Sequence, residues 1–418
     1  MSILIKDVLL NNEKKDILIE GNRISKIDGK IYTKTDYEID GKSRAVVPSF
    51  FNAHTHAAMT LMRGYSDDLI VMEWLQKKIW PLEEKLTEED VYWGSKLACL
   101  EMIKSGTTFF NDMYWHYHGT AKAVEEMGIR AAISAVFIDF LDREKAKEQQ
   151  NLNSKLLEET KKYSDRVQFA LGPHAIYTVS TESLQWAKEF AEKNNCLIHI
   201  HLSESKHEVD DCKKNHRKTP VEYLNDIGFL GPNIIAAHNI WVNKKEIRIL
   251  KDNNVKIVHT PSSNMKLSSG VFPYRKMKKS GLTVSLGTDG CASNNNLDMF
   301  EEMKISSILQ KISSMDPTLK PAHETFELAT INGAETFDID AGVIEEGKLA
   351  DLLLIDLKKP FMVPLHNLVS NLVFSANGSC VDTTICDGKI LMQNGKVEGE
   401  EEIIEKSAEV ARNLVSRV

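Results

Sequence analysis

Short apolar runs and helical patterns alternate through the middle of the chain, from Ala45 to about Gly290. Parallel strands need long crossover connections, usually helices, so this alternation predicts a parallel sheet. Eight such units are the number that closes a barrel, and we predict an α/β fold with a (β/α)8, TIM-like barrel. A doubly wound open sheet is the alternative. The eight predicted strands span residues 45–48, 107–110, 129–136, 167–171, 196–201, 234–237, 255–259 and 283–286.

Local signals predict helices between these strands. Residues 87–90 resemble a capping box, with Thr87 as the N-cap and an acid three residues later, and Gly106 is placed to end that helix. Thr219-Pro220 predicts another helix, because proline at the first helical position loses no hydrogen bond.

The two ends of the chain are rich in strands in a way that the middle is not. Turn residues separate neighbouring runs at both ends, as at Gly21-Asn22 and Gly388. We expect the two ends to pair with each other. The predicted organisation is a small β-sandwich domain made of residues 1–45 and 345–418, and a barrel domain of residues 46–344.

Composition restricts the classes of partner. The net charge is -8 at pH 7, whereas nucleic acids and anionic membranes attract concentrated Lys and Arg. No apolar stretch approaches the roughly 18 residues of a membrane span, and the start lacks a signal-peptide layout. The six cysteines form no C-x-x-C pair, and there is no nucleotide-binding glycine motif. We expect a cytoplasmic protein that acts on a small molecule, binds neither nucleic acid nor membrane, and is compatible with homo-oligomer formation.

Histidines and acids gather where the predicted strands end. In a (β/α)8 barrel the catalytic residues lie at the carboxyl ends of the strands, so this placement is typical of an active site. The residues concerned, in strand order, are His54 and His56, His174, His201 and Glu204, His238, His259, and Asp289.

His54 and His56 are two residues apart, which puts both side chains on one face of an extended strand. His201 and Asp289 add a third imidazole and a carboxylate. Three nitrogens and one oxygen favour one divalent ion, Zn²⁺ first, with Fe²⁺ or Mn²⁺ as alternatives. Such an ion makes a hydroxide nucleophile available near neutral pH. The His-Thr-His triplet alone would also suit two packed or surface histidines, but four residues at matching strand ends favour a metal.

Two further residues are predicted to serve the metal. Glu204, three residues after His201, is placed to take a proton from an activated water and return it, although an acid there could simply favour a helix start. His238 is expected beside the metal, where it would steady the attacking water or a developing oxyanion. His259 is expected to be a buried histidine with satisfied hydrogen bonds.

At this point the sequence resembles the amidohydrolase superfamily, and most closely its branch of methylthioadenosine/S-adenosylhomocysteine deaminases, with chlorohydrolases and guanine deaminases as cousins. The resemblance spans nearly the whole chain. The matching segments are residues 52–64, 74–75 with 80–83, 172–174, 201–204, 236–238, 261–267, 286–290 and 347–352.

The resemblance implies a mononuclear hydrolase that releases ammonia from an adenosine-type nucleoside. It also implies that Asp289 helps to move protons, Trp74 packs on the substrate, Glu83 binds ribose hydroxyls, His174 binds the nucleoside, and Glu204 contacts a ring nitrogen. From the residues alone, Trp74 could be a core residue and Glu83 a solvated acid at a helix end.

One departure from the branch concerns the substrate. Members that handle S-adenosylhomocysteine can carry arginines for its carboxylate, and those places hold Ala135 and Gln149 here, with Arg143 out of register. Methylthioadenosine, adenosine and 5′-deoxyadenosine therefore stay candidates beside S-adenosylhomocysteine. Deamination of guanine or a triazine is the nearest rival, and a non-catalytic relative of the fold is another.

Overall fold

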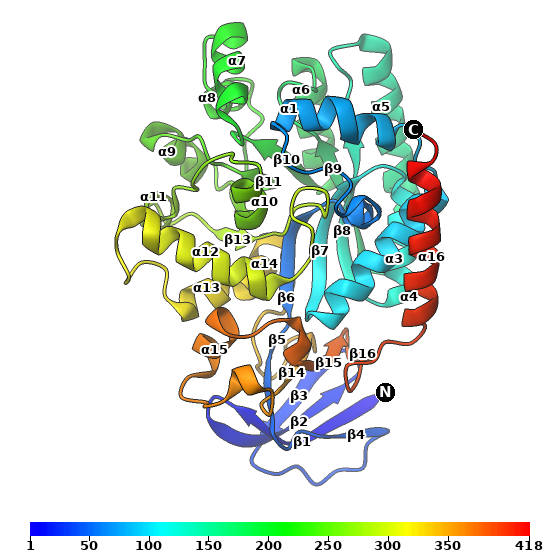
Figure 1. The fold of residues 1–418 in the computed structure, drawn as a ribbon, viewed down its shortest axis with the longest axis vertical. Coiled ribbons are helices and arrows are strands. Elements are labelled where there is room, and N and C mark those ends of the chain that lie inside the picture. Colours follow the sequence, from blue (N-terminus) through cyan, green and yellow to red (C-terminus); the bar gives the residue numbers. More distant parts are fainter.

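The structure, a computed structural model, describes residues 1–418, and eight parallel strands form its centre. Each strand pairs with the next along the chain, and the last lies beside the first, where the Asp289 N–H donates to the carbonyl of His54 at 2.9 Å. The predicted (β/α)8 barrel is thus confirmed (Figure 1). The strands are β6 (Phe50–Thr55), β7 (Thr107–Tyr114), β8 (Arg130–Phe137), β9 (Val167–Pro173), β10 (Leu197–Leu202), β11 (Ile234–His238), β12 (Lys256–His259) and β13 (Val284–Leu286).

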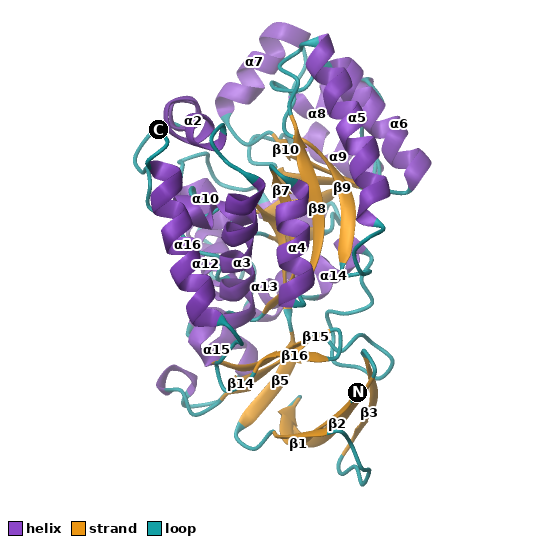
Figure 2. Cartoon of the chain, turned by 90° about the vertical axis from the view of Figure 1, so that its right-hand side faces the viewer, coloured by secondary structure: helices purple, strands orange, loops and turns teal.

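Helices surround the barrel and connect its strands (Figures 1 and 2). Those around the first half are η1 (Ala57–Met62), α1 (Val71–Trp74), η2 (Leu75–Ile79), α2 (Trp80–Glu83), α3 (Glu88–Lys104), α4 (Tyr117–Met127), α5 (Arg143–Thr160) and α6 (Thr181–Asn194). The others are α7 (Lys206–His216), α8 (Pro220–Asp226), α9 (Lys244–Asp252), α10 (Pro261–Lys266), α11 (Tyr274–Lys279), α12 (Met299–Ser314), α13 (Ala322–Ala329) and α14 (Ile331–Phe337).

The predicted helix signals act as expected. Helix α3 begins with a complete capping box, in which the Thr87 hydroxyl accepts from the Asp90 N–H and the Asp90 carboxylate accepts from the Thr87 N–H. Gly106 follows that helix with a φ of 90°, a value that favours glycine. Thr219 begins α8 with Pro220 in the first turn.

The first predicted barrel strand, residues 45–48, is wrong. Those residues lie in β5 (Arg44–Pro48), which pairs antiparallel with β14 (Leu352–Asp356) in the other sheet. The chain changes sheets at Ser49, whose N–H donates to Asp351, while the N–H of Phe50 donates to Gly106 in the barrel. Residues 45–55 form a nearly continuous buried run, so their hydrophobicity could not show where one sheet ends and the other begins.

The two ends of the chain form the second sheet, as predicted, below the barrel in Figure 2. It is mixed, and its order is β16-β15-β14-β5-β1-β2-β3, with β4 also paired to β1. Isoleucines and leucines from both chain ends pack into one apolar cluster on this sheet, including Ile5, Ile19 and Leu354. The remaining strands are β1 (Ser2–Leu10), β2 (Glu13–Glu20), β3 (Arg23–Asp28), β4 (Tyr37–Asp40), β15 (Val381–Cys386) and β16 (Lys389–Met392).

The last helix runs back along the barrel. Helix α16 (Glu400–Val415) lies beside α3, where the Ser407 hydroxyl donates to the carbonyl of Trp93 at 3.0 Å (Figure 1). The chain also contains α15 (Leu368–Phe374) and the short turns η3 (Pro360–Met362) and η4 (Gly378–Cys380). None of the helices combines the length and apolarity needed to cross a bilayer. The exact domain bounds stay a prediction.

The interior of the barrel divides into two parts. Phe51, Phe109, Ala132, Ile235 and Val258 pack into one apolar cluster contributed by β6, β7, β8, β11 and β12. His54, His201, His238 and His259 lie at or near the carboxyl ends of β6, β10, β11 and β12. The polar chemistry of the barrel interior is therefore concentrated at one end, above an apolar floor.

Candidate active site

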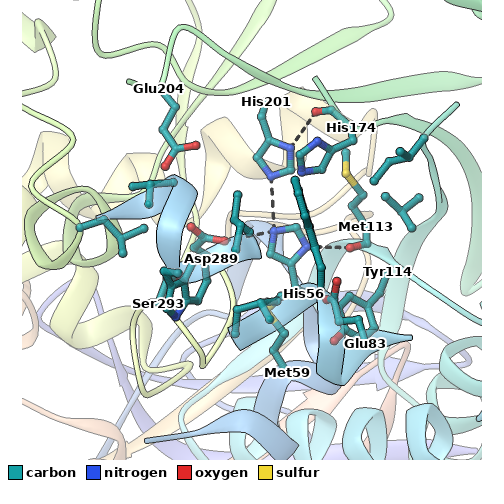
Figure 3. Close-up of a pocket in the computed structure, with 18 of the residues that line it drawn as sticks. His56, Met59, Glu83, Met113, Tyr114, His174, His201, Glu204, Asp289 and Ser293 are labelled. Atoms are coloured by element: carbon teal, nitrogen blue, oxygen red, sulfur yellow. Dashed lines mark hydrogen bonds and ion pairs between the residues drawn. The ribbon is translucent and has the colours of Figure 1, made fainter. Parts of the chain in front are cut away.

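A pocket opens at the carboxyl ends of the barrel strands. Of its 21 lining residues, 13 are hydrophobic. A mostly apolar pocket with a few polar groups suits a small ligand. Figure 3 shows His56, His201 and Asp289 close together, with Glu204 and Glu83 on opposite sides of this group.

The four predicted metal ligands converge. The Asp289 Oδ1 atom lies 3.3 Å from His54 Nε2 and 3.2 Å from His56 Nε2. The Nε2 atoms of His56 and His201 are 3.3 Å apart. His238 also joins this group, because its ring lies within metal-binding reach of His54 and His201. Three nitrogens and a carboxylate oxygen thus face a common point from β6, β10 and the loop after β13.

Backbone carbonyl groups orient two of these rings. His56 Nδ1 lies 2.6 Å from the carbonyl oxygen of Met113, and His201 Nδ1 lies 2.8 Å from that of His174. Neutral rings held this way carry the proton on Nδ1 and present the lone pair of Nε2 toward the cluster.

The residues present fit a divalent ion. His54 Nε2 is buried without a hydrogen-bond partner, although it points at the Asp289 carboxylate. A buried polar atom left unpaired is costly, and a cation between it and Asp289 removes that cost. The group of His54, His56 and Asp289 could therefore hold a metal ion, as could that of His54, His201 and His238.

The electrostatics of the cluster agree with this fit. Burial lowers the pKa of His54 to about 4, so this ring is neutral near pH 7. Burial acts in the same direction on His56, but contact with Asp289 outweighs it and raises the pKa of His56 to about 9. Burial alone would raise the pKa of Asp289, yet the two histidines hold it well below its usual value. Asp289 is therefore paired with positive charge on His56, carried by a proton that a metal ion at this point would displace.

The loop after β13 places Asp289 by close backbone approach. A side chain at Gly287 would meet the backbone of His54 at 2.7 Å, so glycine is required there. The Gly290 N–H donates to Asp289 Oδ1 at 2.8 Å, and the Ser263 hydroxyl donates to Oδ2 at 2.6 Å. One carboxylate oxygen thus faces the histidines while the other is held by Ser263.

His238 is held at the end of β11 by the segment that begins α10. Its Nδ1 atom lies 2.9 Å from Asn264 Oδ1 and 3.0 Å from the Thr260 hydroxyl. Its Nε2 atom faces the pocket, 3.9 Å from Glu204 Oε2. The two predicted proton-handling groups, Glu204 and His238, are therefore neighbours beside the ligand cluster.

Sequence reasoning assigned no role to Ser263 and Asn264. Both lie within the matching segment 261–267, and both are buried. The only sequence signal for such a role was a run of small polar residues directly after the buried strand β12. Their function depends on contacts with Asp289 and His238, which come from other strands.

All five predicted substrate-binding residues line the same pocket: Trp74, Glu83, His174, Glu204 and Asp289. Trp74 is buried, and its indole N–H donates to the carbonyl of Ser66 at 3.2 Å. Glu83 lies near Tyr114, and burial raises its pKa. Burial lowers the pKa of His174 to about 3, so its ring is neutral at neutral pH. Their substrate roles stay predictions.

The expectation for His259 is half wrong. The residue is fully buried, and its ring stacks on Phe272 with centroids 4.4 Å apart. Neither ring nitrogen has a hydrogen-bond partner, so the histidine is not satisfied. Stacking on Phe272, which the sequence did not reveal, takes the place of the hydrogen bonds expected for His259.

No lysine or arginine lines the pocket, whose charged residues besides histidine are Glu83, Glu204 and Asp289. Ala135 is buried in β8 and Gln149 lies on α5, and neither reaches the lining. Arg143 is exposed at the start of α5. The pocket therefore offers no guanidinium or ammonium group to a substrate carboxylate.

Comparison with known proteins places the chain among enzymes of one family. The amidohydrolase family profile matches residues 45–391. A 5-methylthioadenosine/S-adenosylhomocysteine deaminase 1 of Archaeoglobus fulgidus is 50% identical over 420 residues, which cover 99% of each chain. A 5'-deoxyadenosine deaminase of Methanoregula boonei is 45% identical over 423 residues, which cover 100% of this chain and 96% of the other. An adenosine deaminase structure from Xanthomonas campestris with bound zinc has a TM-score of 0.93 and 30% identity, covering 99% and 98% of the two chains. Because the family profile matches most of the chain and the relatives match it along nearly its whole length, this chain belongs to the amidohydrolase family.

Proposed function

We propose that this protein is a metal-dependent hydrolytic deaminase of adenosine-type nucleosides, with one divalent ion, Zn²⁺ by preference. The observation that carries the proposal is the convergence of His54, His56, His201 and Asp289 at the floor of a pocket that also presents Glu204 and His238. The names of the relatives support the same reaction, because they are deaminases of adenosine derivatives.

The protein's own residues then move protons during the addition of water to C6 of the purine. When bound, the ion supplies Lewis acidity that makes water nucleophilic near neutral pH. Glu204 takes a proton from the attacking water and delivers it to the adjacent ring nitrogen, which makes C6 more electrophilic. Asp289 passes the second proton to the amino group, so that ammonia leaves and a carbonyl remains. His238 hydrogen-bonds the oxygen as it adds.

The walls of the pocket suit the remainder of a nucleoside. Trp74 offers an aromatic face on one side, and Glu83 is placed to accept from ribose hydroxyls. His174 stands beside His201, with ring centroids 4.8 Å apart, and its ring can hydrogen-bond the nucleoside from the edge of the ligand cluster.

We further propose that the preferred substrates carry a short, uncharged 5′ group, as 5′-deoxyadenosine and methylthioadenosine do. S-adenosylhomocysteine adds a carboxylate that needs a cationic, preferably bidentate, partner. Val136 and Ile138, which follow Ala135 along the chain, line the pocket, and its acidic residues repel a carboxylate. Poor use of S-adenosylhomocysteine is therefore expected.

The test is ammonia release from adenosine, methylthioadenosine, 5′-deoxyadenosine, S-adenosylhomocysteine and guanine by the zinc-loaded protein. We expect turnover of the first three and a much lower kcat/KM for S-adenosylhomocysteine. Activity on guanine alone would support the rival deaminase, and metal binding without turnover of any compound would support a non-catalytic relative.

A variant separates chemistry from metal binding. Glu204→Gln keeps the size of the side chain but cannot carry a proton, so turnover should fall about 10²–10⁴-fold, the range for a general acid–base group. Its zinc content should equal that of the wild type. A variant that deaminates adenosine analogues at nearly the wild-type rate would exclude this role. A cytoplasmic location and compatibility with homo-oligomer formation remain predictions.

A further inference from the structure

One of the three ligand histidines is oriented differently from the others. His56 and His201 are held by backbone carbonyl groups, which substitution of a side chain leaves in place. His54 Nδ1 instead lies 2.6 Å from Nε2 of His199. The orientation of His54 thus depends on a second side chain.

His199 lies on β10, two residues before His201, with its side chain on the same interior face. It is completely buried and does not line the pocket. Its ring centroid is 4.8 Å from that of His54, and the two rings are nearly perpendicular, at 86°. A residue so placed cannot touch a substrate in the pocket, and its effect must pass through His54.

The hydrogen bond fixes the proton positions in both rings. His54 presents Nε2 toward Asp289 and has no other partner for that atom. If Nε2 binds a cation through its lone pair, the proton of the neutral ring sits on Nδ1 and is donated to His199. His199 then accepts with Nε2 and carries its own proton on Nδ1, a buried atom that has no hydrogen-bond partner.

We propose that His199 is the positioning residue of this metal site: it fixes the tautomer and ring orientation that leave Nε2 of His54 available to the ion. The inference deepens the proposed function and rests on its metal site. Partners that hold a metal-binding histidine in this way typically contribute 10–100-fold to metal affinity.

Two substitutions test the acceptor. His199→Phe keeps an aromatic ring of similar size but removes the acceptor. His199→Gln extends an amide oxygen toward the place of Nε2 and can restore it. The matched control is His259→Phe, because His259 is equally buried on a barrel strand but makes no hydrogen bond to any ligand residue.

The measurements are the zinc dissociation constant, from competition with a chromophoric chelator, and the visible spectrum of the cobalt-substituted protein. We expect His199→Phe to weaken zinc binding about 10–100-fold and to alter the cobalt spectrum, whereas His199→Gln recovers most of the affinity and the control binds like the wild type. If His199→Phe does not fold, His199→Met replaces it, since a thioether is only a weak acceptor.

Three outcomes would overturn the inference: wild-type affinity in the variant that lacks an acceptor, equal losses in the phenylalanine and glutamine variants, or the same loss in the control. A wild-type protein that binds neither zinc nor cobalt would instead refute the metal site itself. The two failures are therefore distinguishable.

Discussion

Arg130 links the barrel to the sheet formed by the chain ends, and its replacement tests this contact. Arg130, at the start of β8, donates from Nε to Asp351 Oδ2 at 3.0 Å and from Nη2 to Asp387 Oδ1 at 2.5 Å. The Asp351 side chain has no exposed surface, and that of Arg130 is 9% exposed. The pair is thus a buried ionic contact between the two sheets.

Replacing Arg130 by methionine should cost about 3–5 kcal/mol at neutral pH, the usual result of leaving one charge of a buried pair unpaired. Burial already raises the pKa of Asp351, and Arg130 is the main group that opposes this. Without the arginine, the pKa of Asp351 in the folded protein rises further above its unfolded value. The folded variant then binds more protons than the unfolded chain, so its stability falls as the pH rises through the folded pKa.

The assay is denaturant unfolding of wild type and Arg130→Met, followed by tryptophan fluorescence at about pH 7.5 and about pH 5.5. We expect a smaller loss of stability at the lower pH, where Asp351 can accept a proton. The double variant Arg130→Met/Asp351→Asn removes the orphaned charge and should recover much of the loss. An equal loss at both pH values, with no recovery in the double variant, would refute the reasoning.

Three further predictions concern the site and one helix. Chelation should abolish activity and lower the midpoint of thermal unfolding. Zinc at 100 times its dissociation constant should then restore about 2.7 kcal/mol of folding stability. An unchanged midpoint after chelation would argue against a resident metal. Glu83→Gln should raise the KM for adenosine about 10-fold, or about 1.4 kcal/mol, but should change that for 2′,3′-dideoxyadenosine little, because only the former has the hydroxyls that Glu83 is proposed to bind. Thr87→Ala should destabilise the protein by about 1 kcal/mol through loss of the α3 cap, and an unchanged unfolding midpoint would contradict the capping role.

The barrel could be predicted because its main signal is repetitive. Seven of the eight predicted runs overlap the barrel strands β7 to β13, since a buried parallel strand needs a short apolar segment between helices. The run at residues 45–48 failed because it adjoins the first barrel strand almost without interruption. Only hydrogen bonding, with Ser49 donating to one sheet and Phe50 to the other, separates the two.

The residues at strand ends could also be predicted, because the topology itself brings them together. Once His54, His201 and Asp289 are assigned to carboxyl ends of strands in one barrel, they share a rim whatever their separation in sequence. The structure does place them at one point, although their roles as ligands await a metal measurement.

The partners that orient these residues could not be predicted in the same way. Ser263 reaches Asp289, and Asn264 reaches His238, across gaps between neighbouring loops. Such contacts depend on strand register and side-chain direction to within about 1 Å, and a sequence pattern contains neither. His199 and His201 belong to one His-Ile-His run and share a face of the strand. The pattern alone therefore could not distinguish the histidine that binds the metal from the one that orients another ligand.

Carboxylate binding at the substrate end of the pocket is a further property that the structure can decide and the sequence cannot. Ala135 and Gln149 in place of arginines raise a question about carboxylate binding, but an arginine elsewhere could have filled the same role. The lining contains none, and Arg143, the nearest candidate in sequence, is exposed at the start of α5. Because Glu83, Glu204 and Asp289 also line the pocket, a carboxylate there would be repelled by these acids and would find no lysine or arginine to pair with. The selectivity proposed for short, uncharged 5′ groups therefore rests on the whole lining rather than on two substituted positions.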